Sequence, residues 1–511
     1  MASVPQPRMM VTGRIRTMAG PDERADWMLV DSGRIVATGS GLAPEHGDGV
    51  DRLSLGDSTV LPALADCHVH FLETGLLDVD VDLSVSSCFD EVLALIADGA
   101  RDVEGSMLRA HSFDPDLLSD GRYPTIRELD AISTELPIII RRRDGHSSVL
   151  NTRAMEALRI GNGIDGVEVD TEGCPTGVMR MDANTLAARR SRDALSREEQ
   201  VRSFHEAARK AASRGIGVVH TLVGSCDPDN RDLEVLLETA RDLPIEIVPF
   251  AQMEDIDRVV SLGLPRIGGC LLLDGSFSSG TAALMEPYAD RPGNGVLYYD
   301  DDHLTGFFRR AHERGLQVSV HALGERAIGQ ALRCYRDACG GECRDSRHRI
   351  EHCELPSRAD IAEMRSLGVA ACVQPTFELL WGDPGGMIEK RLGTARAART
   401  NPYRTYLDAG VRLAGGSDSY VTPMDSLLGI HAAVNRPNAA ERICVYDAVS
   451  LFTRGAAWIS FDDGRRGTLE AGKEASFCVL DADPFEVAPG RIRDIRSERL
   501  FRAGVEITPQ G

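Results

Sequence analysis

Short apolar runs alternate with amphipathic stretches from about residue 62 to residue 440. Runs of this length predict buried strands, and amphipathic stretches between them predict helices. Repeated strand and helix alternation indicates a parallel sheet, and so many units favour a closed (β/α)8 barrel of the TIM type over an open sheet. We therefore expect an α/β fold whose strands include the runs at 65–71, 215–224, 245–253, 270–276, 316–324, 348–354, 368–375 and 411–419.

Both ends of the chain show a different pattern. Residues 10–61 and the stretch after about residue 464 alternate apolar and polar positions between turn signals, which is typical of short antiparallel strands. We expect the two ends to pair into one small β-sandwich domain, made of residues 1–61 and 441–511, beside a barrel domain at 62–440. Residues 77–200 fit the barrel repeat poorly, so we expect an insertion there.

Composition narrows the class of protein. The chain has 511 residues, 42% hydrophobic and 26% charged, with a net charge of −21. Such a charge repels nucleic acid and anionic membrane surfaces, and no apolar run approaches the roughly 18 residues of a membrane helix. We expect a cytoplasmic protein with a small-molecule partner. The twelve cysteines are too sparse for a disulfide framework and are expected to be thiols, and the group at 334–343 matches no common zinc spacing.

Side chains that can bind metal stand at the ends of several predicted strands. His68 and His70 lie two apart on an extended segment, which points both rings to the same side. His321, His352 and Asp418 each end a later run. One polar strand end is often a core or loop group, but the ordered set predicts a metal centre at the barrel mouth. No P-loop, dinucleotide-binding fingerprint or serine-hydrolase nucleophile elbow is visible in the sequence. A bound metal ion that activates water is therefore the best-supported catalytic group.

Longer motifs extend this pattern over nearly the whole chain. They read RYPTIRELD, RDGHSSVLNTRAMEAL, GCPTGVM, LLLDGSFSSGTAAL, VSVHALGERAIGQAL, RHRIEHCEL, AGGSDSYVTP and GTLEAGKEASFCVLDADPF. In this order, together with the H-x-H strand, they resemble the amidohydrolase superfamily, in the family 3-like branch that includes N-substituted formamide deformylase.

The resemblance implies a metal-dependent hydrolase that cleaves a carbon–nitrogen bond in an amide, an N-acyl or N-formyl compound or a cyclic amide. It implies that His68, His70 and Asp418 hold the more buried metal and that His321 and His352 hold a second one. Asp418 is then also the proton shuttle for a metal-activated hydroxide. The expected cofactor is one or two divalent ions, with Zn²⁺ favoured. A homodimer is compatible with the resemblance, although no sequence feature fixes it.

Cys270 departs from the family pattern. Where many members read K-[LIV]-x-x-D-G and carry a carboxylated lysine that bridges two metals, this chain reads C-L-L-L-D-G. A thiolate is a soft anionic ligand, so Cys270 can bridge metals and would favour zinc. The alternative is that Cys270 only fills space beside a single metal held by the histidines and Asp418.

The sequence leaves the substrate-contacting residues and the type of reaction open. His146, His220, Asp274 and Ser276 are expected to contact substrate, although His146 is equally read as a loop residue and His220 more readily as a core residue. The same site also suits a metal-dependent decarboxylase or a carbon–carbon bond hydrolase. A hypothesis from another class is a non-catalytic, metal-stabilised binding protein.

Overall fold

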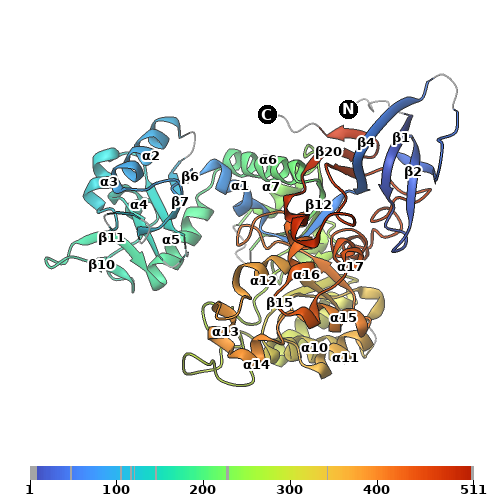
Figure 1. The fold of residues 1–511 in the computed structure, drawn as a ribbon. Coiled ribbons are helices and arrows are strands. Elements are labelled where there is room, and N and C mark those ends of the chain that lie inside the picture. The colour runs from blue at the N-terminus through green and yellow to red at the C-terminus, as the bar shows by residue number, and fades with distance from the viewer. Residues whose placement is uncertain are drawn as a thin grey trace. The chain divides into compact units, whose positions relative to one another are not determined.

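The computed structural model describes residues 8–45, 49–103, 106–115, 118–119, 121–143, 145, 147–225, 230–341 and 343–507. The chain divides into two compact units (Figure 1). The first contains Met1–Phe71, Ala208–Leu233 and Ala240–Gly511, and the second contains Leu72–Ala207 and Glu234–Thr239. The helices α1 (Phe71–Val79), α6 (Arg197–Ser213) and α7 (Asp232–Thr239) run across the boundaries along the chain.

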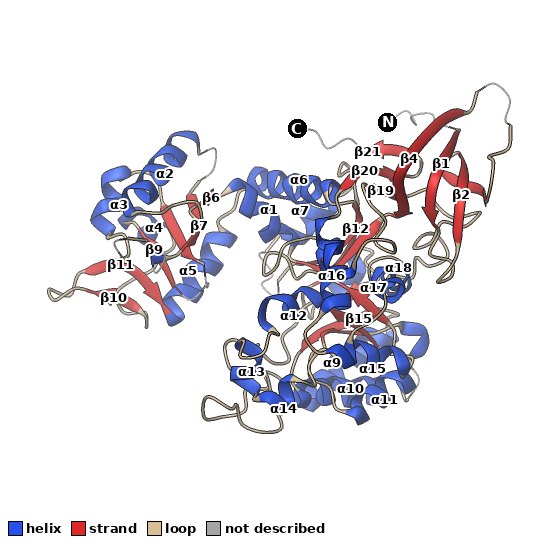
Figure 2. Cartoon of the chain, viewed as in Figure 1, coloured by secondary structure: helices blue, strands red, loops and turns tan. Residues whose placement is uncertain are grey.

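An eight-stranded parallel sheet forms the centre of the first unit. Figure 2 labels two of its strands, β12 and β15. Its order is β18-β17-β16-β15-β14-β13-β12-β5. A bridge joins Val69, at the end of the first outer strand, to Ser419, which follows the other outer strand, so the sheet is nearly closed. The (β/α)8 barrel is therefore confirmed. The strands are β5 (Leu64–Val69), β12 (Ile216–Val223), β13 (Glu246–Ala251), β14 (Arg266–Ile267), β15 (Gln317–Ala322), β16 (Arg349–His352), β17 (Ala370–Val373) and β18 (Leu413–Gly415).

Helices follow most of these strands and cover the barrel. Local sequence fixes several starts: Asp300 accepts a hydrogen bond from the His303 amide, and Ser357 and Asp360 form a capping box. The helices are α8 (Ile256–Ser261), α9 (Asp301–Glu313), α10 (Glu325–Ala338), α11 (Arg358–Leu367), α12 (Pro375–Trp381), α13 (Met387–Leu392), α14 (Thr394–Ala397), α15 (Tyr403–Asp408), α16 (Ser426–Asn435), α17 (Val445–Leu451) and α18 (Arg454–Ile459). Short 3-10 turns are η2 (Arg344–Ser346), η3 (Ala439–Glu441) and η4 (Pro489–Asp494).

One predicted strand lies elsewhere. The apolar run at 271–273 was expected to be extended, but the strand here is β14, which ends before Cys270, and the run keeps only a single bridge from Leu272 to His321. Gly268 explains the shift. Its φ is 93°, and a Cβ there would lie 2.1 Å from the Ser319 carbonyl oxygen, so the chain turns tightly against β15. Cys270 therefore follows the strand at its carboxyl end.

Both ends of the chain contribute to one seven-stranded sheet, in the order β21-β20-β19-β4-β1-β2-β3. Several of its strands contribute to one hydrophobic core that includes Val11, Ile35, Phe477 and Phe501. The two ends of the chain thus pair in a single sheet, whereas the domain boundaries at 61 and 441 stay predictions. The strands are β1 (Met9–Arg16), β2 (Arg24–Asp31), β3 (Arg34–Gly39), β4 (Asp51–Pro62), β19 (Phe477–Leu480), β20 (Ser497–Arg502) and β21 (Val505–Ile507).

The second unit has its own six-stranded sheet, ordered β10-β11-β9-β8-β7-β6. Two cores lie on it, one with Phe113 and Ile140 and one with Leu150 and Met179. The extent of the insertion, about 77–200, stays a prediction. The elements are β6 (Val81–Asp82), α2 (Phe89–Asp102), β7 (Leu108–Phe113), α3 (Ile126–Ile132), β8 (Ile138–Arg142), β9 (Ser147–Leu150), α4 (Thr152–Ala157), β10 (Val167–Val169), β11 (Pro175–Arg180) and α5 (Met181–Asp193).

Candidate metal centre

The barrel brings the predicted metal ligands into one cluster at the carboxyl ends of its strands. The Oδ1 atom of Asp418 lies 3.1 Å from His68 Nε2 and 3.3 Å from His70 Nε2. Cys270 Sγ lies 3.5 Å from His321 Nδ1. The ring of His352 lies between these pairs, because its centroid is 4.7 Å from that of His68 and 4.5 Å from that of His321.

The backbone is shaped to hold this cluster together. His352 and Asp418 both have positive φ values, 69° and 57°, which are uncommon for residues other than glycine. Gly416 precedes Asp418, and a Cβ there would lie 2.6 Å from the Cβ of His68. Gly416 therefore allows the chain at the end of β18 to approach β5 closely. The Asp418 amide then donates to the His68 carbonyl at 2.8 Å.

The far side of the His68 ring fixes its tautomer. His68 Nδ1 lies 2.6 Å from Glu351 Oε2, and both side chains are fully buried. A carboxylate can only accept a hydrogen bond, so the neutral His68 ring carries its proton on Nδ1. The lone pair of Nε2 is then directed towards Asp418. A carboxylate behind a histidine is a common support for a metal ligand.

His321 is oriented in the same way by a different acceptor. Its Nε2 donates to the Gly275 carbonyl oxygen at 3.2 Å, so the Nδ1 atom is the one that faces Cys270. Burial opposes a thiolate, but the facing imidazoles, His321 first among them, hold the pKa of Cys270 well below its usual range. Burial also opposes the charged form of His321, yet the Cys270 sulfur raises its pKa to about 9.

The same electrostatics govern Asp418. Although burial favours its neutral form, His68 and His70 keep the pKa of Asp418 well below its usual range. Among the described buried atoms, His68 Nε2, His352 Nδ1 and Asp418 Oδ1 make no hydrogen bond of good geometry. Nitrogen and oxygen atoms without a hydrogen-bond partner, beside a thiolate, are the ligand atoms of a transition-metal site. The residues present therefore fit a divalent cation.

Sequence reasoning missed the charged pair behind this cluster. Glu351 Oε1 lies 2.5 Å from Arg349 Nε, and both side chains are fully buried. The Arg349 guanidinium also lies over the Phe250 ring, with its central carbon 3.7 Å from the ring centroid, and is fully buried. Burial opposes the Glu351 carboxylate, but Arg349 and His68 lower its pKa. Two charged residues in the predicted strand segment RIEH were the signal, because buried charges are paired or functional.

A cavity of about 380 Å³ opens beside the cluster. His70, Cys270, His321, His352 and Asp418 line one side of it. Apolar side chains form much of the remaining wall, including Phe277, Leu323, Phe377, Trp381 and Ile388. This size and lining suit a small molecule with an apolar substituent.

Glu354 is a buried acid in the cavity wall that the sequence analysis did not select. Asn401 Nδ2 lies 3.3 Å from Glu354 Oε2 and 2.8 Å from Glu378 Oε1, so one amide holds two carboxyl groups. Burial and the nearby Glu378 raise the pKa of Glu354 to about 8. The Arg436 guanidinium forms an ion pair with Glu378, with 3.1 Å between a guanidinium nitrogen and Glu378 Oε2.

The remaining expected substrate contacts lie in different places. Ser276 lines the cavity. Asp274 is fully buried and accepts hydrogen bonds from the amides of Ala283, Leu323 and Gly324, which accounts for its carboxylate without a substrate. His220 is buried with its Nδ1 3.2 Å from Arg349. His146 lies outside the described residues. Substrate contact by these four side chains stays a prediction.

Comparison with known proteins agrees with the geometry. The pattern of the amidohydrolase family matches residues 53–508. The chain belongs to the amidohydrolase family. Its fold matches the crystal structure of a metal-dependent hydrolase from Pyrococcus furiosus with a TM-score of 0.80 and 28% identity, covering 94% of this chain and 100% of that one.

Two curated relatives of this amidohydrolase span the same length. It is 25% identical to N-substituted formamide deformylase of Arthrobacter pascens, over 97% of each chain. It is 29% identical to the protein LONG AFTER FAR-RED 3 of Arabidopsis thaliana, over 94% of this chain and 88% of the relative. The protein is therefore an enzyme, a metal-dependent hydrolase that acts on small molecules, and the alternative of a non-catalytic binding protein is set aside.

Proposed function

We propose that this amidohydrolase cleaves a carbon–nitrogen bond in a small amide, an N-acyl or N-formyl amine or a cyclic amide. The observation that carries the proposal is the orientation of His68 and His321. When the rings are neutral, an acceptor behind each one leaves the lone pair of the nearer nitrogen directed into a cluster with two anionic groups, Asp418 and Cys270. The relative named N-substituted formamide deformylase supports the bond type.

In this proposal the side chains of the cluster form two sets of metal ligands. His68, His70 and Asp418 would hold one divalent cation, and His321 and His352 would hold a second, with Cys270 between the sets. A thiolate is a soft ligand, so the proposed metal is zinc. When bound, such a cation polarises a carbonyl oxygen and lowers the pKa of water.

The side chains of the chain itself would do the rest. The Asp418 carboxylate faces the cavity beside both His68 and His70, where it can take a proton from the attacking water and return it to the leaving nitrogen. Phe377 and Trp381 would exclude bulk water around the substrate. The bond broken is carbon–nitrogen, and the products are a carboxylic acid and an amine.

Metal analysis beside an amide panel tests this proposal. We expect purified protein to lose activity on chelator treatment, to regain it with zinc, and to release amine from N-formyl or N-acyl amines. Cys270→Ser should bind less zinc than the wild type, while Cys444→Ser, at an exposed cysteine, serves as the matched control. Unchanged zinc content in Cys270→Ser would rule out Cys270 as a ligand. Activity confined to carbon–carbon substrates would refute the amide assignment.

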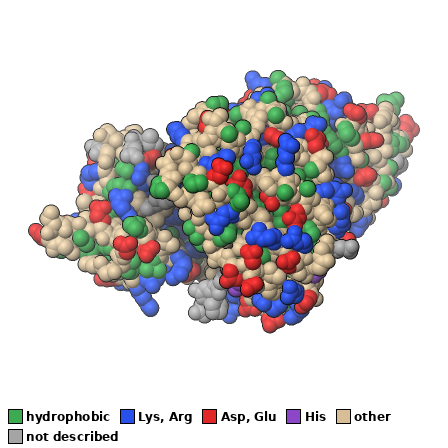
Figure 3. Space-filling model, turned by 90° about the horizontal axis from the view of Figure 1, so that it is seen from below, with side chains coloured by type: hydrophobic (Ala, Val, Ile, Leu, Met, Phe, Trp, Pro, Cys, Tyr) green, Lys and Arg blue, Asp and Glu red, His purple; other side chains and the backbone are tan. Residues whose placement is uncertain are grey.

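The cellular location and the oligomeric state complete the proposal. None of the helices in the described part of the chain has the length and apolarity of a membrane span. On the face seen in Figure 3, basic and acidic side chains are interspersed among apolar ones. The cytoplasmic location and the homodimer stay predictions.

A further inference from the structure

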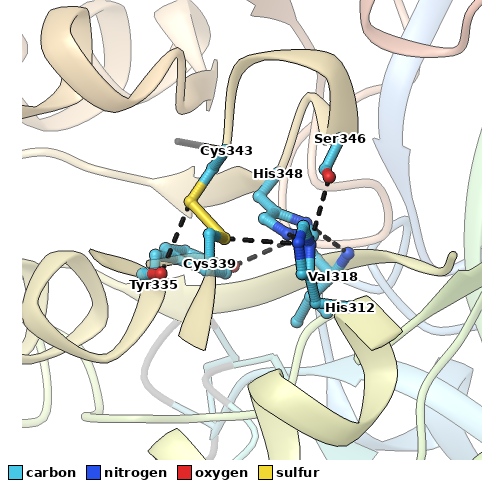
Figure 4. Close-up of a disulfide and its surroundings, with 7 residues drawn as sticks. All are labelled: His312, Val318, Tyr335, Cys339, Cys343, Ser346 and His348. Carbon is cyan, nitrogen blue, oxygen red and sulfur yellow. Dashed lines mark hydrogen bonds between the residues drawn. A yellow bond between two sulfur atoms is a disulfide. The ribbon is translucent and has the colours of Figure 1, made fainter. Parts of the chain in front are cut away.

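A second cluster of sulfur and imidazole lies away from the cavity, where α10 connects to β16 (Figure 4). Cys339 and Cys343, expected from the sequence to be thiols, are joined as a disulfide. His312, from α9, places its Nδ1 atom 3.8 Å from Cys339 Sγ. Ser346 Oγ and His348 Nε2 lie 3.2 Å and 3.3 Å from the same nitrogen. We call these five residues the Cys339 cluster.

The Cys339 cluster has the atoms of a metal site but the wrong tautomer. The Val318 amide donates to His348 Nδ1 at 2.9 Å, so the lone pair of this ring is on Nδ1 and its proton is on Nε2. Burial and the neighbouring His312 lower the pKa of His348 to about 3, which keeps the ring neutral. An Nε2–H group donates and cannot bind a metal. The same group therefore donates to His312 Nδ1.

This chain of hydrogen bonds leaves His312 as a proton acceptor beside a sulfur atom. Its Nδ1 carries a lone pair, because His348 Nε2–H donates to it. Cys339 is the C-cap residue of α10, where the helix carbonyl groups disfavour a thiolate, so a nearby base matters for its reactivity. Cys339 is half-buried, whereas Cys343 is fully buried. An external reagent would thus reach Cys339 first.

We propose that Cys339 and Cys343 form a thiol–disulfide exchange site for low-molecular-weight thiols and disulfides, with His312 as the base for Cys339. In the reduced pair, the Cys339 thiol replaces His348 Nε2–H as the donor to His312 Nδ1, which takes the thiol proton, and the thiolate attacks one sulfur of a small disulfide. The first small thiolate leaves and is protonated, which gives a mixed disulfide on Cys339. The Cys343 thiol loses its proton and attacks Cys339 Sγ, and the second small thiol leaves. Two cysteine thiols are oxidised, and one small disulfide is reduced to two thiols.

The chain offers natural controls for this chemistry. Cys174 and Cys444 are exposed free cysteines. The Cys444 sulfur lies 3.2 Å from Asp447 Oδ2, and burial together with this carboxylate raises the pKa of its thiol. Exposure alone would direct a small disulfide to these two positions. Reaction at Cys339 instead would require the base that His312 provides.

The experiment uses the full-length protein, first reduced and then treated with oxidised glutathione. Free thiols are alkylated at intervals and located by peptide mass spectrometry. We expect the wild type to form the Cys339–Cys343 disulfide without a lasting adduct. Cys343→Ser should accumulate a glutathione adduct on Cys339 faster than on Cys444. His312→Gln in that background should slow the adduct roughly tenfold, which corresponds to the loss of one pKa unit of thiolate stabilisation.

Three results would overturn the proposal. One is a pair that remains alkylatable after equilibration with oxidised glutathione. Another is an adduct that forms first on Cys174 or Cys444 in Cys343→Ser. The last is an unchanged rate in His312→Gln with an unchanged melting temperature, which would show that the ring supplies no base. Ser346→Ala, which removes only a hydroxyl from His312, is the matched variant and should retain most of the rate.

Discussion

Glu351→Gln tests the reading of the metal centre most directly. The substitution keeps the shape of a fully buried side chain but removes the charge that faces both His68 and Arg349. The guanidinium of Arg349 is a permanent cation, so it retains the one amide oxygen as its acceptor. The amide NH₂ group then faces His68 Nδ1 and forces its lone pair onto that atom. His68 Nε2 becomes a donor and can no longer bind a metal.

Two magnitudes follow from this geometry. Breaking a buried ion pair by neutralising one partner costs about 3 kcal/mol of folding stability, because the Arg349 charge stays buried. Losing the orienting carboxylate behind a histidine ligand weakens metal binding by roughly 10- to 100-fold. Stability is measured by denaturant unfolding of the metal-free protein, so that metal binding does not add to it. Metal affinity is measured by competition with a chromophoric chelator.

Glu378→Gln is the matched control. Glu378 is also buried and forms a pair with buried Arg436 at 3.1 Å, but its contacts are with Thr400 and Asn401 and not with a histidine. We expect Glu378→Gln to lose a similar amount of stability and to bind the metal as the wild type does. If Glu351→Gln loses stability but keeps the wild-type metal affinity, the argument that Glu351 fixes the His68 tautomer is refuted.

Three further variants probe other parts of the molecule. Asp418→Asn should lower kcat by roughly 10²- to 10⁴-fold in an amine-release assay, as expected for removal of a general acid–base group. Gly416→Ala should lower both the melting temperature and the metal content, because its Cβ would lie 2.6 Å from that of His68. Burial opposes the Glu246 carboxylate, but Arg465 and Arg466 lower its pKa from 4.5 to about 2. Its stabilisation of about 3 kcal/mol is therefore present above pH 4.5 and lost as the pH falls towards 2, so the stability difference between the wild type and Glu246→Gln should shrink over that range.

The barrel could be predicted because its strands are buried on both faces and therefore read as continuous apolar runs. The strands β12, β13 and β15 lie within the predicted runs. The run after Cys270 failed because Leu271–Leu273 is as apolar as a strand, while the turn at Gly268 is set by contact with Ser319. A contact between segments so far apart along the chain leaves no mark in local periodicity.

The centre was predictable only in part for the same reason. Strand alternation places Glu351 and His352 on opposite sides, yet Glu351 binds His68 Nδ1 and the His352 ring lies 4.7 Å from the His68 ring. The positive φ of His352 breaks the alternation and turns the ring towards the cluster. Residue types and spacing indicated which side chains would cluster, whereas the contacts behind each of them depend on backbone turns that the sequence pattern does not show.

What lies behind each imidazole separates the two sulfur and histidine clusters of this protein. A carboxylate stands behind His68 and a carbonyl behind His321, so both rings direct a lone pair to their cluster. A backbone amide stands behind His348, so that ring directs a proton to its cluster. Cysteine and histidine in similar proximity would thus give the proposed metal centre in one place and the proposed proton relay beside a disulfide in the other. A histidine cluster is therefore best assigned from the partner of its far nitrogen, because that partner decides whether the near nitrogen accepts a cation or donates a proton.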